Sequence, residues 1–192
     1  DIFNRFLLAG YKFVQTWEGF VYHMTCRGSR FADGAKRNPN GEVFMKNRET
    51  DEWLAQNIRS TRNFIRKWGH FVKHDAHLKP IVPPKYDIGF VVKNCNEQLL
   101  EALEPWCSDI YVDEVVREGY ILKEQPNTLF DLSLRVNPMK NIVINDIEIR
   151  FDGSKFNDKS FQYIQQLSEI LANDELEVGS FELDIFEITI NK

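Results

Sequence analysis

The chain has 192 residues, of which 43% are hydrophobic, and a formal net charge of −5, which suits one or two packed domains. Residues 1–85 carry 15 lysines and arginines against 8 acidic residues, whereas residues 86–192 carry 9 against 21, so we expect two units with different surfaces. No apolar run approaches the roughly 20 residues that cross a bilayer, which excludes a membrane-spanning helix, and three cysteines without a C-x-x-C pair argue against a disulfide framework.

The first predicted element is an amphipathic helix at the very start of the chain. Its apolar residues recur at the i, i+3, i+4 spacing that places them on one helical face: Ile2, Phe3, Phe6 and Leu7. Gly10 stands where a helix commonly stops in a left-handed cap. Because the chain starts with Asp rather than Met and enters this helical pattern without a capping residue ahead of it, we expect a fragment of a longer protein.

Two short extended runs follow, and the second of them, Phe20–Tyr22, ends at His23. The segment after it is rich in Gly, Pro, Asn and Ser, which predicts a loop. Four cations make this loop basic: Arg27, Arg30, Lys36 and Arg37. One interpretation is a solvated loop. The other is a phosphate-facing flap, since guanidinium groups bind diphosphate oxygens in pairs.

These segments together resemble the C-terminal part of a family 2 glycosyltransferase of GT-A fold. The residues that carry the resemblance are Asp1-Ile-Phe-Asn-Arg5, Leu8-Ala-Gly-Tyr11 and Phe20-Val-Tyr-His23. In that family an acidic pair supplies the catalytic base, an Asp follows one residue later, and a strand carries a His towards the active site. The resemblance covers roughly residues 1–70, matches Asp1 to that Asp, and places the acidic pair and the nucleotide-binding half before it.

The resemblance implies transfer of a sugar from a nucleotide-sugar donor to an acceptor hydroxyl in glycan or polysaccharide synthesis, with Mn²⁺ or Mg²⁺ on the diphosphate. It assigns His23 to the metal, Asp1 to the support of the catalytic base, and Trp17 to the lining of the site. Arg27 and Arg30 would hold the diphosphate, which favours the flap interpretation of the basic loop. Without the resemblance, a backbone-bonded His23 and a core Trp17 are the plainer interpretations.

A second helix is predicted to open at Thr50-Asp-Glu52, with acids in its first turn, and to stop at Gly69. Four basic residues lie among its polar positions: Arg59, Arg62, Arg66 and Lys67. A solvated basic face is the favoured interpretation, and contact with an anionic acceptor or a membrane surface is the alternative. The helix lacks the exposed aromatic residues that a nucleic-acid stacking platform interleaves with its cations, so we expect no nucleic-acid partner.

Residues 79–85 are rich in proline and read as an extended linker, between a glycosyltransferase-like portion over residues 1–78 and an acidic unit over residues 86–192. The acidic unit begins with a strand to Lys93, a short helix capped by Asn96, and a strand over residues 109–113. Residues 114–140 fit either helix or strand. A further strand, a helix after Asn157 and one long closing strand over residues 181–190 complete two β-α-β units. We therefore expect a mixed α+β fold whose second domain is ferredoxin-like.

The acidic unit carries no motif that indicates chemistry. Its carboxylate pairs, Asp109 with Asp113 and Asp146 with Glu148, are best explained as solvent-facing positions of amphipathic strands. We expect an interaction or assembly module with a protein partner, and Cys26, Cys95 and Cys107 as reduced thiols in a cytoplasmic protein. Two alternatives stay open, namely a non-catalytic two-domain adaptor and an acidic unit that folds back on the basic loop and gates it.

Overall fold

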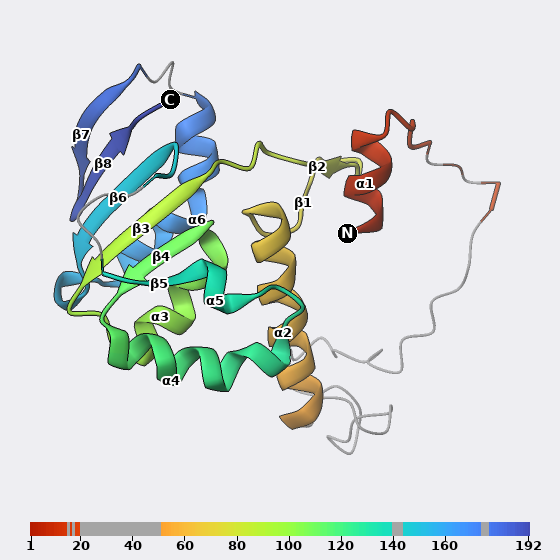
Figure 1. Cartoon of the computed structure of the whole chain (residues 1–192). Helices are drawn as coiled ribbons and strands as arrows, with labels where there is room; N and C mark the ends of the chain where they lie inside the picture. The colour runs from red at the N-terminus through yellow and green to blue at the C-terminus, as the bar shows by residue number, and fades with distance from the viewer. Residues whose placement is uncertain (15, 17, 20–50, 140–143, 174–176) are drawn as a thin grey trace, which may run out of the picture.

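The computed structural model describes residues 1–14, 16, 18–19, 51–139, 144–173 and 177–192. Its N-terminal elements are two helices and a small antiparallel pair of strands (Figure 1): α1 (Ile2–Leu8), α2 (Asp51–Trp68), β1 (Lys73–His74) and β2 (Pro80–Ile81). Both helices end just ahead of the predicted glycine, because Gly10 and Gly69 have the positive φ values of 82° and 77° that terminate a helix.

The acidic unit, residues 86–192, forms one mixed sheet with helices between its strands (Figure 1). The strands are β3 (Ile88–Lys93), β4 (Asp109–Val112), β5 (Val136–Pro138), β6 (Ile147–Asp152), β7 (Gly179–Leu183) and β8 (Phe186–Ile190). The helical segments are α3 (Glu97–Leu103), η1 (Glu104–Trp106), α4 (Glu114–Glu124), η2 (Gln125–Asn127), α5 (Leu132–Arg135), η3 (Gly153–Lys155) and α6 (Asp158–Asn173). The prediction of a mixed fold of strands and helices is confirmed.

The strand order of the sheet is β5-β4-β3-β6-β8-β7. Strands β5, β4, β3 and β6 are parallel to one another, whereas β8 runs antiparallel to both β6 and β7. A ferredoxin-like unit has a split β-α-β arrangement, in which another strand separates the two parallel strands. Here β3 and β4 pair directly, with Phe90 opposite Ile110, so the expectation of a ferredoxin-like topology is wrong.

The hydrophobic core lies between one face of this sheet and the helices. Alternate side chains of β3 and β6, among them Phe90 and Ile149, share one buried cluster with Leu100 of α3 and Leu167 of α6. The intervening residue Val91 faces the other side of the sheet, where it packs with Tyr111 and Met139. The alternation follows from the two-residue period of a strand, and it gives a two-layer arrangement with these helices on one face.

Local sequence signals predicted some features of these elements correctly and others wrongly. The Asn96 side chain accepts a hydrogen bond from the backbone N–H of Leu99 at 2.8 Å and caps α3, as predicted. The long closing strand was a wrong prediction, because Asp184 adopts φ 56° and the chain turns into a hairpin in which Leu183 pairs with Phe186. Asp184 also accepts a hydrogen bond from Ser160 of α6 at 2.8 Å, which ties the turn to the helix.

A buried ionic network joins α2 to the sheet and helices of the acidic unit, residues 86–192, called the α/β unit below. Arg66 is fully buried, and its Nη2 lies 2.7 Å from Glu104 Oε2 and 2.6 Å from Glu124 Oε1. Arg62 pairs with Glu124 at 3.0 Å, and Arg135 with Glu104 at 2.8 Å. The interpretation of α2 as a solvated basic face is therefore wrong for Arg62 and Arg66, which face internal carboxylates rather than water.

The proposed division at residues 79–85 stays a prediction, although the contacts of α2 cross it. Burial opposes the charge of Arg66, but its hydrogen bonds and ion pair with Glu104 outweigh that cost and raise its pKa. Burial likewise opposes the charge of Glu104, and the contacts with Arg66 and Arg135 nevertheless lower its pKa. Both groups are therefore charged inside the protein, as a paired buried ion requires.

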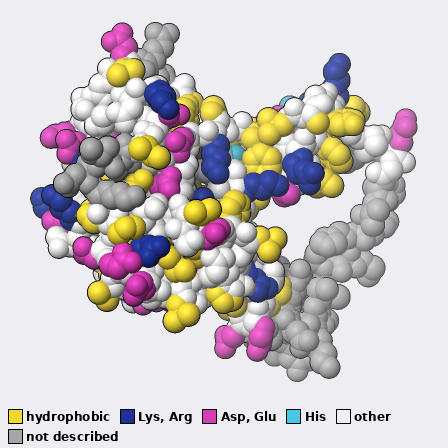
Figure 2. Space-filling view, in the orientation of Figure 1, with side chains coloured by type: hydrophobic (Ala, Val, Ile, Leu, Met, Phe, Trp, Pro, Cys, Tyr) yellow, Lys and Arg dark blue, Asp and Glu magenta, His cyan; other side chains and the backbone are white. Residues whose placement is uncertain are grey.

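The apolar face of α1 is exposed, whereas on α2 exposure is confined to the first half of the helix, at Leu54 and Ile58, and Ile65 is buried. Ile2, Phe3 and Leu8 are each at least 58% exposed, and Asn4 is the buried residue of this helix. Figure 2 shows hydrophobic side chains gathered over α1, and acidic side chains over the α/β unit. Among the helices that the structure describes, none is long and apolar enough to cross a membrane.

Candidate functional site

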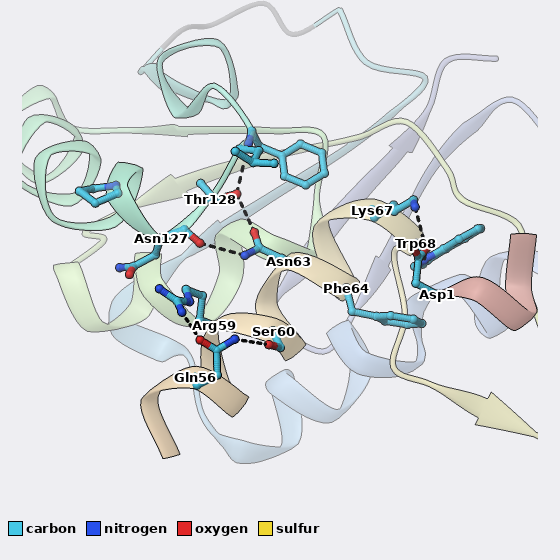
Figure 3. A pocket seen from close by; sticks show the side chains of 13 residues that line it. Asp1, Gln56, Arg59, Ser60, Asn63, Phe64, Lys67, Trp68, Asn127 and Thr128 are labelled. Carbon is cyan, nitrogen blue, oxygen red and sulfur yellow. Dashed lines mark hydrogen bonds and ion pairs between the residues drawn. The ribbon is translucent and has the colours of Figure 1, made fainter. Parts of the chain in front are cut away.

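A cleft of about 540 Å³ lies between α2 and the loop around η2 (Figure 3). It combines aromatic rings, amides, hydroxyls and charged groups, a mixture suited to a polar ligand with apolar faces. Its lining residues are Asp1, Gln56, Arg59, Ser60, Asn63, Phe64, Lys67, Trp68, Pro126, Asn127, Thr128, Leu129 and Phe130. Asp1, Lys67 and Trp68 lie at one end of the cleft, and Gln56, Arg59 and Ser60 at the other.

Asp1 brings a carboxylate from α1 to this cleft. It occupies the N-cap position of α1, yet its side chain makes no capping hydrogen bond to that helix. Instead its Oδ1 accepts from Lys67 Nζ at 2.6 Å and from Trp68 Nε1 at 3.1 Å. The ion pair is roughly half exposed on both sides, so it stabilises the fold by no more than about 1 kcal/mol, and its effect is on the orientation of the carboxylate.

The wall opposite Asp1 is fixed by hydrogen bonds between α2 and the loop of residues 126–130. Asn63 Nδ2 donates to the backbone carbonyl of Asn127 at 2.9 Å. Asn63 Oδ1 accepts from Thr128 Oγ1 at 2.6 Å and from Arg66 Nη1 at 3.0 Å. The same Arg66 belongs to the buried ionic network, so the shape of the cleft is tied to the packing of α2 on the α/β unit.

The two cations of the cleft differ in their charge balance. Lys67 is paired with Asp1, whereas Arg59 hydrogen-bonds the neutral amide of Gln56. Within the part of the chain that the structure describes, no carboxylate pairs with Arg59. Counting the described side chains alone, the far end of the cleft is positively charged, which favours a neutral or anionic ligand over a cation.

Aromatic rings supply the apolar part of the lining. The Phe64 and Trp68 rings lie one helical turn apart on α2, with centroids 6.3 Å apart and planes inclined by 38°. The Lys67 ammonium lies 5.1 Å from the centroid of the Trp68 ring, and the Arg135 guanidinium lies 5.5 Å from that of Phe130. Both are cation–π distances, and they hold the rings in place.

The structure places one of the five predicted site residues, Asp1, at the cleft. Trp17, His23, Arg27 and Arg30 lie outside the described residues, so their assignments stay predictions. The sequence pattern groups Lys67 with a solvated basic face and Trp68 with an apolar helical stripe. A basic residue followed by Trp immediately before a helix-ending glycine is the one sequence signal that could have drawn attention to this pair.

The divalent cation also stays a prediction. The described side chains bring together no group of three or more His, Cys, Asp or Glu that could hold a metal ion, and His23 lies outside them. Cys95 and Cys107 are both buried and free, as predicted. Burial raises the pKa of the Cys95 thiol to about 12 and raises that of Cys107 as well, so neither is a nucleophile.

A second place to look for a ligand in a parallel sheet is the point where the strand order reverses, here between β3 and β6. The residues at and just after the carboxyl ends of these two strands contact each other. Asn94 Nδ2 donates to Asp152 Oδ1 at 2.9 Å, and a Cβ on Gly153 would lie 2.7 Å from Leu99 Cδ2. The cleft beside α2 is therefore the better candidate.

No protein-family profile, curated protein or solved structure matches the chain. The resemblance of residues 1–70 to family 2 glycosyltransferases therefore stays a prediction.

Proposed function

We propose that the chain is part of a glycosyltransferase that moves a sugar from a nucleotide-sugar donor to an acceptor hydroxyl in glycan or polysaccharide synthesis. In this reaction the bond between the anomeric carbon and the diphosphate oxygen breaks. The acceptor oxygen forms a new bond to that carbon, and the acceptor proton passes to a catalytic base. In this proposal Asp1 would support that base, His23 would hold a divalent cation that neutralises the charge of the diphosphate, and Arg27 and Arg30 would stabilise the leaving group.

One observation carries the proposal. The residue that the resemblance singles out, Asp1, directs its carboxylate away from its own helix and into a cleft of mixed polar and aromatic character. A structural N-cap would bond the backbone N–H groups of its own first turn. An acceptor sugar offers hydroxyls and apolar ring faces together, which fits the amides, hydroxyls and rings of this lining.

The proposal is tested by titrating uridine or guanosine diphosphate with Mn²⁺ into the full-length gene product. We expect saturable binding that depends on the metal and weakens in His23→Ala and in Arg27→Ala. Lys155→Ala is the control, because Lys155 is exposed and lies outside the cleft. Binding that persists unchanged in both variants would remove these residues from the site, and no binding of either nucleotide would overturn the proposal.

The exposed apolar face of α1 favours a second candidate, a non-catalytic adaptor that binds a protein partner. This candidate predicts no metal-dependent binding of a nucleoside diphosphate. It also predicts that a Phe3→Ser and Leu8→Ser double variant loses the partner while every nucleotide titration stays flat. Both side chains are well exposed, at 60% and 65%, so the double variant leaves the packed core unchanged.

A further inference from the structure

We infer that Lys67 and Trp68 are positioning residues, through which the α/β unit fixes the carboxylate of Asp1. The inference rests on the proposed function for the role of Asp1 in supporting the catalytic base. Its geometry stands on contacts between α1 and α2 that are independent of any reaction.

Two donors of different kinds converge on one oxygen atom. Lys67 Nζ supplies a charge 2.6 Å from Asp1 Oδ1, and Trp68 Nε1 supplies a directional N–H at 3.1 Å. Within the described residues Oδ2 takes part in no hydrogen bond. Binding through Oδ1 therefore fixes that oxygen and, among the described residues, leaves Oδ2 available to accept a hydrogen bond in the cleft.

The carboxylate lies where a helix by itself would repel it. Lys67 and Trp68 are the last two residues of α2, and the C-terminal end of a helix carries the negative end of its dipole. An acidic group is held there only when local donors outweigh that repulsion. The side chains of Lys67 and Trp68 provide such donors, whereas the backbone at this end offers carbonyl groups.

The donors are themselves held by the α/β unit. Arg66, the residue before them, is fully buried in the network with Glu104 and Glu124. Its backbone carbonyl accepts a hydrogen bond from Lys85 Nζ at 2.7 Å, just ahead of β3. The final turn of α2 is thus anchored through both its side chains and its backbone. The acidic unit, which the sequence pattern indicates only as an assembly module, thereby sets the position of Asp1.

The contact is tested first in the 192-residue chain by ¹⁵N NMR of the indole N–H groups. The sequence holds four tryptophans, so the resonances are few and assignable by substitution. We expect Asp1→Ala to shift the Trp68 indole resonance and to leave that of Trp106, which is buried in the core. Arg5→Ala is the control on the same helix, because the Arg5 side chain is exposed and lies outside the cleft. An unmoved Trp68 resonance in Asp1→Ala would overturn the placement.

The role is then tested by transfer kinetics in the full-length gene product. We expect Lys67→Met and Trp68→Phe each to lower kcat by about 10–100-fold, the scale of a misplaced group, with little change in the KM for the donor. Lys67→Arg should restore part of the rate. Lys79→Met is the matched control, because Lys79 is exposed and lies outside the cleft.

The outcomes separate the two ideas. If the enzyme is active and its kcat is unchanged by both substitutions, the positioning role is overturned and the proposed function stands. A gene product that transfers no sugar would overturn the proposed function. In that case the indole resonance still decides whether Lys67 and Trp68 hold the carboxylate of Asp1.

Discussion

Arg66 and Glu104 are the residues whose burial most constrains the sequence of this chain, because each is fully buried and charged. Replacing Arg66 with Met leaves the Glu104 carboxylate without its closest partner in the interior. We expect Arg66→Met to lower the free energy of unfolding by about 3–5 kcal/mol, the cost of an uncompensated buried charge. Urea denaturation followed by circular dichroism measures this change.

The matched control is Arg59→Met, two turns earlier on α2. Arg59 is exposed and contacts the amide of Gln56, so its replacement should change the free energy of unfolding by no more than about 0.5 kcal/mol. Equal effects of the two substitutions would contradict the assignment of Arg66 to a buried network.

We expect His70 to make the free energy of unfolding depend on pH. Its ring is fully buried, it contacts the Phe71 carbonyl and the Phe64 ring, and its Nε2 has no hydrogen-bond partner in the described structure. Burial lowers its pKa below 6.5, a shift that the Phe71 hydrogen bond opposes and the nearby Lys73 charge reinforces. The unfolded chain therefore binds this proton at a higher pH than the folded protein does.

The free energy of unfolding should accordingly be constant above about pH 6.5, the unperturbed value, and fall as the pH drops below it. We expect His70→Leu to flatten this dependence between about pH 7.5 and 5.5, whereas His74→Gln, at an exposed position, should preserve it. The measurement is urea denaturation at a series of pH values. A slope that survives in His70→Leu would assign the effect to another group.

At the scale of single elements, two glycines are expected to respond oppositely to alanine. A Cβ at Gly153 would lie 2.7 Å from Leu99 Cδ2 and 3.0 Å from the Asn94 carbonyl oxygen, and a backbone atom cannot easily yield. Gly153→Ala should therefore destabilise the protein by about 1–3 kcal/mol. Gly119 lies within α4 with nothing near its missing side chain, so Gly119→Ala should stabilise by about 0.5–1 kcal/mol. Thermal unfolding of both variants checks the pair.

Elements with strong local signals were predictable from the sequence. The N-cap at Asn96, the helix-ending glycines and the apolar run of β3 each act through neighbouring residues. The hairpin was missed because its turn uses Asp184 in a left-handed conformation without a glycine. The topology was missed because pairing of β3 with both β4 and β6 depends on contacts across 20 or more residues, which periodicity does not encode.

At the scale of the whole molecule, α2 should behave as part of the α/β unit and α1 should not. Ile65 and Arg66 are buried against that unit, whereas Asn4 is the buried residue of α1. We expect amides in the last turns of α2 to exchange hydrogen at rates close to those of β3 and β4, and amides of α1 to exchange much faster. Mass spectrometry after deuterium labelling tests this, and equal protection of α1 and α2 would contradict it.

The candidate site could be predicted only in part from the sequence, because its contacts join residues far apart in the chain. Asp1 was singled out by the resemblance of its helix. Its partners Lys67 and Trp68 lie more than 60 residues away in the chain. The hydrogen bond between Asn63 and Thr128, which shapes the opposite wall, also joins residues more than 60 positions apart. Such pairs depend on how α2 packs, and that packing rests on an ionic network whose members carry no shared sequence pattern.

The same network has an evolutionary consequence. Because Arg66 meets two carboxylates and Glu104 meets three guanidinium groups in the interior, a substitution of one member is costly until its partners change as well. Homologous chains should therefore either keep this set of charges together or replace it together with apolar side chains of similar volume. Arg66 and Glu104 should covary, and either residue should tolerate a mutation only in a background that already carries the compensating one.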